Sequence, residues 1–108
     1  MDLTQKRCVP CEGGTPRLGP AEVAALLPQL AGWQVIDDNG KLRKRFVFPE
    51  FKPAIAFVNR MADLAEAEGH HPDFEVHYNK VDVSIWTHAI HGLSENDFIL
   101  AAKLDRLA

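Results

Sequence analysis

The chain has 108 residues, with 12 Lys and Arg against 15 Asp and Glu, a formal net charge of -3 and 46% hydrophobic residues. These values are typical of one globular domain that is long enough to form a core without metal or disulfide staples. No apolar run approaches the roughly 18 residues of a membrane span, and the start of the chain lacks the apolar stretch of a signal peptide, so we expect a cytoplasmic protein. The chain also lacks a cluster of Lys and Arg, which argues against direct binding to nucleic acid.

Residues 1–19 are expected to form a flexible or extended arm, followed by a single domain over residues 20–108. Proline and glycine interrupt every regular period in the arm. The arm also holds Cys8 and Cys11 in a C-x-x-C pattern. Two thiols are too few for a structural zinc site, and the segment lacks the strand-then-helix setting of a redox motif. We therefore favour a surface pair of reduced thiols over a metal-binding or redox role.

The first half of the domain predicts a short helix followed by a β-hairpin. The helix is expected to begin at Pro20, because proline suits the first helical turn, and to end by Gly32. Two strands are predicted over residues 33–36 and 42–48. The turn between them, 37–40, contains an Asn-Gly pair, which is a strong hairpin signal.

A long amphipathic helix is predicted over residues 51–68, where apolar residues recur on one broad face. Gly69 is suited to end this helix in the left-handed conformation, and Pro72 prevents its continuation. His70 and His71 are therefore expected just beyond the C-terminal end of the helix, in a loop beside a rigid element, where functional residues are common.

A second hairpin and a terminal helix complete the predicted fold. The hairpin strands are expected over residues 74–78 and 80–88, on either side of Asn79. Ser94 is the expected N-cap of the last helix, and Asp97 completes a capping box with it. The order α-β-β-α-β-β-α predicts an α+β fold, namely an antiparallel sheet of about four strands with helices packed on one face.

All five histidines of the chain lie within residues 70–91: His70, His71, His77, His88 and His91. Imidazole donates or accepts a proton near neutral pH and also ligates metals, so the cluster fits acid–base catalysis or metal binding. Adjacent His70 and His71 do not easily point at one ion, which makes metal binding the second interpretation. Because the chain has neither a glycine-rich phosphate loop nor a G-x-S-x-G motif, acid–base chemistry without a cofactor is favoured. His77 and His91 are interpreted as ordinary surface residues.

Four segments around these histidines carry a combined pattern: 66–73 (Glu-Ala-Glu-Gly-His-His-Pro-Asp), 78–81 (Tyr-Asn-Lys-Val), 87–88 (Thr-His) and 92–97 (Gly-Leu-Ser-Glu-Asn-Asp). Together they resemble the pterin-4a-carbinolamine dehydratase family. The resemblance extends from about residue 20 to the C-terminus, and that family's fold has the same order of helices and strands. Phe74 stands where many relatives carry Trp, and Trp86 and His91 add bulk around His88.

The resemblance implies an enzyme that dehydrates 4a-hydroxytetrahydropterin, the carbinolamine that an aromatic amino-acid hydroxylase leaves after using its pterin. Water leaves across C4a and N5, and the product is quinonoid dihydropterin, which a separate reductase recycles. The family's three catalytic histidines correspond to His70, His71 and His88. We assign His70 and His88 to acid–base work and His71 to binding and orienting the substrate. The implied hydro-lyase uses no metal and no cofactor.

Four neighbours of these histidines become candidates for shaping the pterin pocket: Pro72, Thr87, Ala89 and Ile90. Glu66 joins this group because it lies one helical turn before His70, where its carboxylate is placed to fix the tautomer of that imidazole. A solvated helix carboxylate is an equally good interpretation of Glu66. Asp97 matches an acidic position of the family, but helix capping already explains it.

Two other classes of function remain open. Some relatives act as dimerisation cofactors of a homeodomain transcription factor, so the alternative is a protein-binding coactivator module in which catalysis is not required. A His/Cys metal-binding module is the third interpretation. The resemblance also predicts a homo-oligomer, either dimer or tetramer, formed through the sheet edge or the helices, because the open edges of a small sheet need covering.

Overall fold

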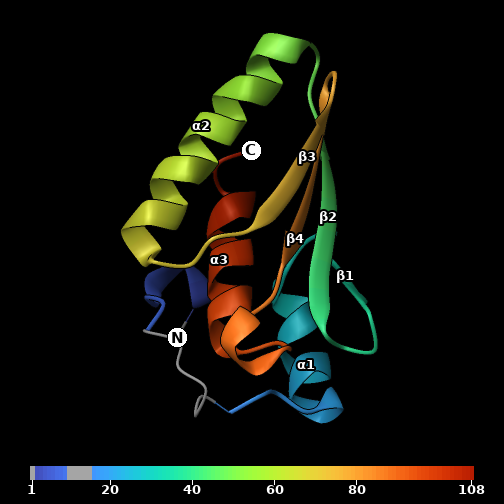
Figure 1. Cartoon of the computed structure of the whole chain (residues 1–108), viewed down its shortest axis with the longest axis vertical. Coiled ribbons are helices and arrows are strands. Elements are labelled where there is room, and N and C mark those ends of the chain that lie inside the picture. Colours follow the sequence, from blue (N-terminus) through green and yellow to red (C-terminus); the bar gives the residue numbers. More distant parts are fainter. Residues whose placement is uncertain (1, 10–15) are drawn as a thin grey trace.

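Four antiparallel strands form one sheet in the spatial order β1-β2-β4-β3, and two helices, α2 and α3, lie along one of its faces (Figure 1). The computed structural model describes residues 2–9 and 16–108. The helices and strands are α1 (Pro20–Leu26), β1 (Gln34–Ile36), β2 (Lys41–Val47), α2 (Phe51–Glu68), β3 (Asp73–His77), β4 (Lys80–Ile85) and α3 (Glu95–Asp105). Three 3-10 helices accompany them: η1 (Leu3–Gln5), η2 (Leu27–Gln29) and η3 (His88–Ile90). This is the predicted α+β fold.

Helix α2 has the bounds that its apolar spacing predicted. Its buried positions follow the helical period and face the sheet and α3: Ala54, Phe57, Met61 and Ala65. Gly69 ends the helix with φ 65°, the left-handed conformation that glycine adopts without steric cost. None of the helices in the described part of the chain is long and apolar enough to cross a membrane.

Strand β2 shows how the sheet divides the side chains between its two faces. Leu42 and Phe46 are buried on the face that the helices cover. Arg43 and Arg45 point to the other face, where both contact the Asp82 carboxylate on β4. The alternation follows from the two-residue period of a strand. We refer to the face that bears the arginines as the outer face of the sheet.

Strand β4 ends three residues earlier than predicted. The last residue pair between β2 and β4 joins Leu42 and Ile85, and β2 begins only one residue before Leu42. Beyond Ile85 the chain therefore loses its ladder partner and folds back on itself, with backbone hydrogen bonds between Thr87 and Gly92. His88 consequently lies in the short helix η3 inside this loop, and not at the end of a strand.

Part of the predicted arm packs into the fold. Leu3 is 2% exposed and belongs to the hydrophobic core. The Cys8 backbone N–H donates to Glu68 Oε1 at 2.8 Å, and the Cys8 thiol donates to the Asn96 carbonyl oxygen at 3.5 Å. Residues 2–9 thus contact the two long helices, whereas the prediction treated the whole arm as flexible or extended on the basis of proline and glycine that begin only at Pro10. Cys11 and the pairing of the two thiols lie outside the described residues.

Candidate active site

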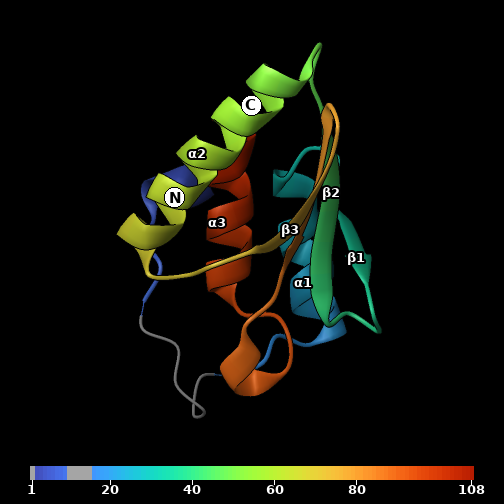
Figure 2. The same ribbon diagram turned by 45° about the horizontal axis from the view of Figure 1, so that its top comes forward.

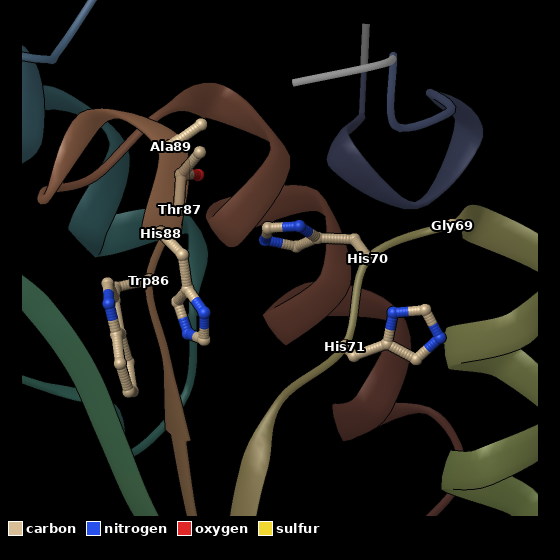
Figure 3. A pocket seen from close by; sticks show the side chains of 7 residues that line it. All are labelled: Gly69, His70, His71, Trp86, Thr87, His88 and Ala89. Carbon is tan, nitrogen blue, oxygen red and sulfur yellow. The ribbon is translucent and has the colours of Figure 1, made fainter. Parts of the chain in front are cut away.

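One pocket brings the three predicted histidines together. It has a volume of about 250 Å³ and opens at the end of the sheet where β4 stops and α2 gives way to β3. Its lining residues come from two loops (Figure 3): Gly69, His70, His71, Trp86, Thr87, His88 and Ala89. In Figure 3, His88 and Trp86 stand on one side of the pocket and His70 and His71 stand on the other.

The turn at Gly69 sends the side chains of His70 and His71 in different directions (Figure 3). His70 is buried, and its Nε2 lies 2.6 Å from Asp97 Oδ1. His71 is exposed, and its Nε2 lies 2.9 Å from Glu66 Oε1. The two neighbours in sequence therefore have different environments, one in the protein interior and one in water.

Glu66 does not contact His70, contrary to our expectation. The carboxylate is paired with His71 instead, five residues further along the chain. The helix ends at Gly69 in the left-handed conformation, so the one-turn spacing that would place Glu66 beside His70 no longer applies. Both partners of the Glu66–His71 pair are largely exposed, and water screens such a pair.

Asp97 is the residue that holds His70. Its carboxylate is fully buried and accepts hydrogen bonds from the Ser94 backbone N–H at 2.8 Å and from the Thr87 hydroxyl at 2.9 Å. The predicted capping box at the start of α3 is therefore present. The same carboxylate also contacts His70, which lies 27 residues earlier in the chain. The sequence analysis interpreted Asp97 only as a helix cap and did not predict this contact.

The Asp97 hydrogen bonds define the state of the His70 ring. A carboxylate that already accepts two hydrogen bonds acts as an acceptor toward Nε2, so Nε2 carries a proton and donates it to Oδ1. In the neutral ring Nδ1 then has the free lone pair. Within residues 2–9 and 16–108, Nδ1 has no hydrogen-bond partner. His70 thus offers an oriented proton acceptor.

His88 is placed by an aromatic contact. Its ring lies against the Trp86 indole, with centroids 4.2 Å apart and an angle of 34° between the planes. The imidazole is exposed at the pocket, on the wall opposite His70 (Figure 3). Stacking uses the face of the ring, so the contact leaves both ring nitrogens available for proton transfer.

The remaining predicted residues fall into two groups. Thr87 is buried and reaches Asp97 through its hydroxyl, and Ala89 lines the pocket beside it. Pro72, Ile90 and Glu66 are not among the residues that line this pocket. The sequence placed Trp86 beside His88 but not the ring contact between them. It missed Asp97 as a contact of His70, although the acidic family position at Asp97 was a usable signal.

Among the residues that the structure describes, one group has the side chains and spacing of a metal site, and it lies on the outer face of the sheet. It consists of Glu75, His77 and Asp82, with His77 Nε2 3.0 Å from Glu75 Oε2. Arg45 already donates two hydrogen bonds to Asp82, at 2.7 and 3.0 Å. These hydrogen bonds hold the pKa of the Asp82 carboxyl below its usual value. A cation would have to displace a guanidinium there, so the arrangement favours an ion-pair network over a metal site.

Cys8, like Asp82, has a pKa that its surroundings shift. Burial raises the pKa of its thiol to about 12, and the Glu68 carboxylate beside it acts in the same direction. A thiol is nucleophilic and ligates metals as the thiolate. Cys8 is therefore an unreactive, packed thiol, which fits the reduced state but not the surface position predicted for it.

The chain matches known proteins over almost its whole length. The sequence profile of the family described as pterin 4 alpha carbinolamine dehydratase matches residues 16–107. A protein of Rubrobacter xylanophilus assigned to the pterin-4-alpha-carbinolamine dehydratases is 46% identical over 106 residues, which are 98% of each chain. A protein of Nitrosospira multiformis with the same assignment is 49% identical over 98% of this chain and 92% of its own.

Two solved structures share the fold. A Brucella melitensis protein described as a transcriptional coactivator/pterin dehydratase superposes with a TM-score of 0.82 at 35% identity, over 86% of this chain and 99% of its own. A pterin dehydratase-like protein described as a RuBisCO assembly factor in the alpha-carboxysome superposes with a TM-score of 0.64 at 28% identity, over 72% of this chain and 90% of its own. Profile, relatives and fold agree, and the chain belongs to the pterin-4a-carbinolamine dehydratase family.

Proposed function

We propose that the protein dehydrates 4a-hydroxytetrahydropterin to quinonoid dihydropterin by histidine acid–base catalysis. The observation that carries the proposal is the gathering of His70, His71 and His88 around one pocket, with His70 held by a buried carboxylate. The reaction needs an acid to protonate the leaving 4a-hydroxyl and a base to take the proton from N5, each within hydrogen-bond reach of the ring. Imidazole performs either task near neutral pH.

The different environments of the histidines favour different roles. The Asp97 hydrogen bond leaves Nδ1 of His70 as a proton acceptor, so we assign His70 as the base for N5–H. His88, on the opposite wall, is assigned as the acid: its proton goes to the 4a-hydroxyl, the C4a–O bond breaks and water leaves. His71 is exposed at the mouth and is assigned to binding and orienting the pterin. Thr87 and Ala89 line the pocket and are kept as candidates for shaping it, whereas Pro72 and Ile90 stay candidates only through the backbone next to lining residues.

In this proposal the enzyme acts in pterin recycling in the cytoplasm, after an aromatic amino-acid hydroxylase and before a reductase. It is also proposed to form a homo-oligomer. Strand β3 is an edge of the sheet, and Phe74 on this strand is 46% exposed. A second copy that packed on this edge would cover both its unpaired backbone groups and the Phe74 ring. Light scattering that finds only monomer at micromolar concentration would contradict this part of the proposal.

The stopped-flow decay of freshly generated 4a-hydroxytetrahydropterin tests the function. The wild-type protein is expected to accelerate the decay over buffer. His70→Ala and His88→Ala should each lose about a hundredfold or more, because a positioned acid or base commonly contributes that much. His77→Ala is the matched control: this exposed histidine lies on the outer face and is expected to retain full activity. Wild-type rates from the His70 and His88 variants would refute the assignment.

A protein-binding role is the second candidate, favoured by the descriptions of the two similar structures as a coactivator and an assembly factor. It predicts that the isolated, folded wild-type protein leaves the decay unchanged from buffer. The same stopped-flow measurement therefore separates the two candidates. If the folded wild type does not accelerate the decay, affinity capture of a protein partner is the next experiment.

A further inference from the structure

Trp86 occupies a position between the outer face of the sheet and the pocket. It follows the last residue of β4, Ile85, and shares its strand parity with Asp82 and Ser84 on the outer face. It nevertheless lines the pocket together with the three histidines (Figure 3). The indole is half-buried. Trp86 is therefore a fixed aromatic surface at the edge of the candidate site.

Lys41 holds the indole from the neighbouring strand. Its Nζ lies 4.2 Å from the centroid of the Trp86 ring, a cation–π distance. The same ammonium is 3.2 Å from the Asp37 carboxylate in the turn that precedes β2. Because Lys41 is the first residue of β2, the indole contacts the strand next to its own as well as following its own strand.

His88 has no other fixed partner in the described part of the chain. His70 is held by Asp97 and His71 is paired with Glu66, but the His88 ring has neither a hydrogen bond nor an ion pair there. Its backbone lies in η3, a three-residue 3-10 helix on the surface. A side chain on so short an element would rotate freely without a neighbour that restricts it. The contact with Trp86, at 4.2 Å between centroids, is that restriction.

We infer that Trp86, supported by Lys41, is a positioning residue for His88. The indole face restricts the orientation of the His88 ring, and both ring nitrogens stay free for the substrate. A hydrogen-bonding partner would occupy one of those nitrogens. The inference rests on the proposed function for its catalytic meaning, whereas the stacking contact itself is testable without catalysis.

The kinetic test compares Trp86→Ala and Trp86→Phe with the wild type in the stopped-flow assay. Trp86→Ala is expected to lower kcat about tenfold with little change in KM, since an aromatic stack restricts orientation more than binding. Trp86→Phe should restore most of the rate, because a smaller aromatic face still stacks. Lys41→Met should lose two- to threefold, whereas Lys80→Met, at the opposite end of β4, is the matched control and should lose nothing.

A double variant separates positioning from a structural role. If Trp86 acts through His88, Trp86→Ala has little further effect in the His88→Ala background. An equal proportional loss in both backgrounds, or no loss in either, would overturn the inference.

The structural arm follows the His88 ring protons by NMR. The indole ring current should shift these signals upfield in the wild type, and Trp86→Ala should remove the shift. A wild-type protein that fails to dehydrate the pterin but shows the shift refutes the proposed function and supports the contact. A protein that dehydrates the pterin but shows neither the shift nor a rate effect of Trp86→Ala overturns the inference alone.

Discussion

Asp97 performs two tasks with one buried carboxylate. It caps helix α3 through the Ser94 N–H and holds the His70 ring through Oδ1. A carboxylate that accepts a hydrogen bond from one imidazole nitrogen leaves the other nitrogen as a base, which is the arrangement used in many hydrolytic enzymes. At the scale of single residues, Asp97 therefore connects the start of helix α3 to the chemistry proposed for His70.

Asp97→Asn is expected to lower kcat at least tenfold with little change in KM. The amide keeps the size of the side chain but no longer enforces donation from His70 Nε2, so Nδ1 loses its defined role as acceptor. Stopped-flow kinetics measures the effect, and the thermal midpoint monitors the loss of the cap. In a His70→Ala background the Asn substitution should add little. A full additional loss there would show that Asp97 acts independently of His70.

The sequence indicated the histidines but not their partners. The combined pattern around His70, His71 and His88 is local and readable, because each segment is contiguous. The contact of His70 with Asp97 spans 27 positions and depends on how α3 packs beside the loop after α2. Glu66 was assigned to His70 from helical spacing alone, which the left-handed turn at Gly69 invalidates. Long-range contacts of this kind require the tertiary structure.

At the scale of elements, the end of helix α2 determines where the two adjacent histidines point. Figure 2 shows the chain leaving α2 and crossing toward the sheet as β3. The helix and its glycine stop were predictable, because the apolar period and the C-terminal glycine are strong local signals. The early end of β4 was not, because it depends on where β2 begins on the neighbouring strand.

Gly69→Ala is expected to destabilise the fold by about 1 kcal/mol, because a residue with a Cβ resists the left-handed conformation. A Cβ at Gly69 would meet no atom within 4 Å, so the cost is conformational and not steric. Urea unfolding measures the change. Gly69→Asn is the matched variant and should lose less, because asparagine tolerates this conformation. Equal stability of the Ala variant and the wild type would contradict the stated role of Gly69.

At the scale of the whole molecule, the two faces of the sheet differ in chemistry. One face packs against the helices through apolar residues, whereas the outer face carries a charged network centred on Asp82. Residues 2–9 dock onto α2 and α3, and Leu3 is buried in the core. Composition did not predict that docking: the proline and glycine that indicated a flexible arm begin at Pro10, and residues 2–9 contain neither.

The Asp82 network predicts loss of stability in acid. The hydrogen bonds from Arg45 lower the pKa of the Asp82 carboxyl in the folded protein, so the folded state binds fewer protons than the unfolded chain. The resulting stabilisation is complete above the ordinary carboxyl pKa of about 4 and is lost as pH falls through the lower folded value. The thermal midpoint should fall as the pH drops below about 4. Asp82→Asn should show a smaller fall, and an identical fall in both proteins would contradict the assignment.

The central claim is that this protein itself removes water from 4a-hydroxytetrahydropterin with His70 and His88. The most direct measurement is the stopped-flow decay of freshly generated carbinolamine with equal concentrations of the wild type and the His70→Ala/His88→Ala double variant. We predict acceleration over buffer by the wild type and a rate close to buffer for the double variant, with both proteins folded by circular dichroism. A folded wild type that leaves the decay at the buffer rate, or a double variant as fast as the wild type, would contradict the claim.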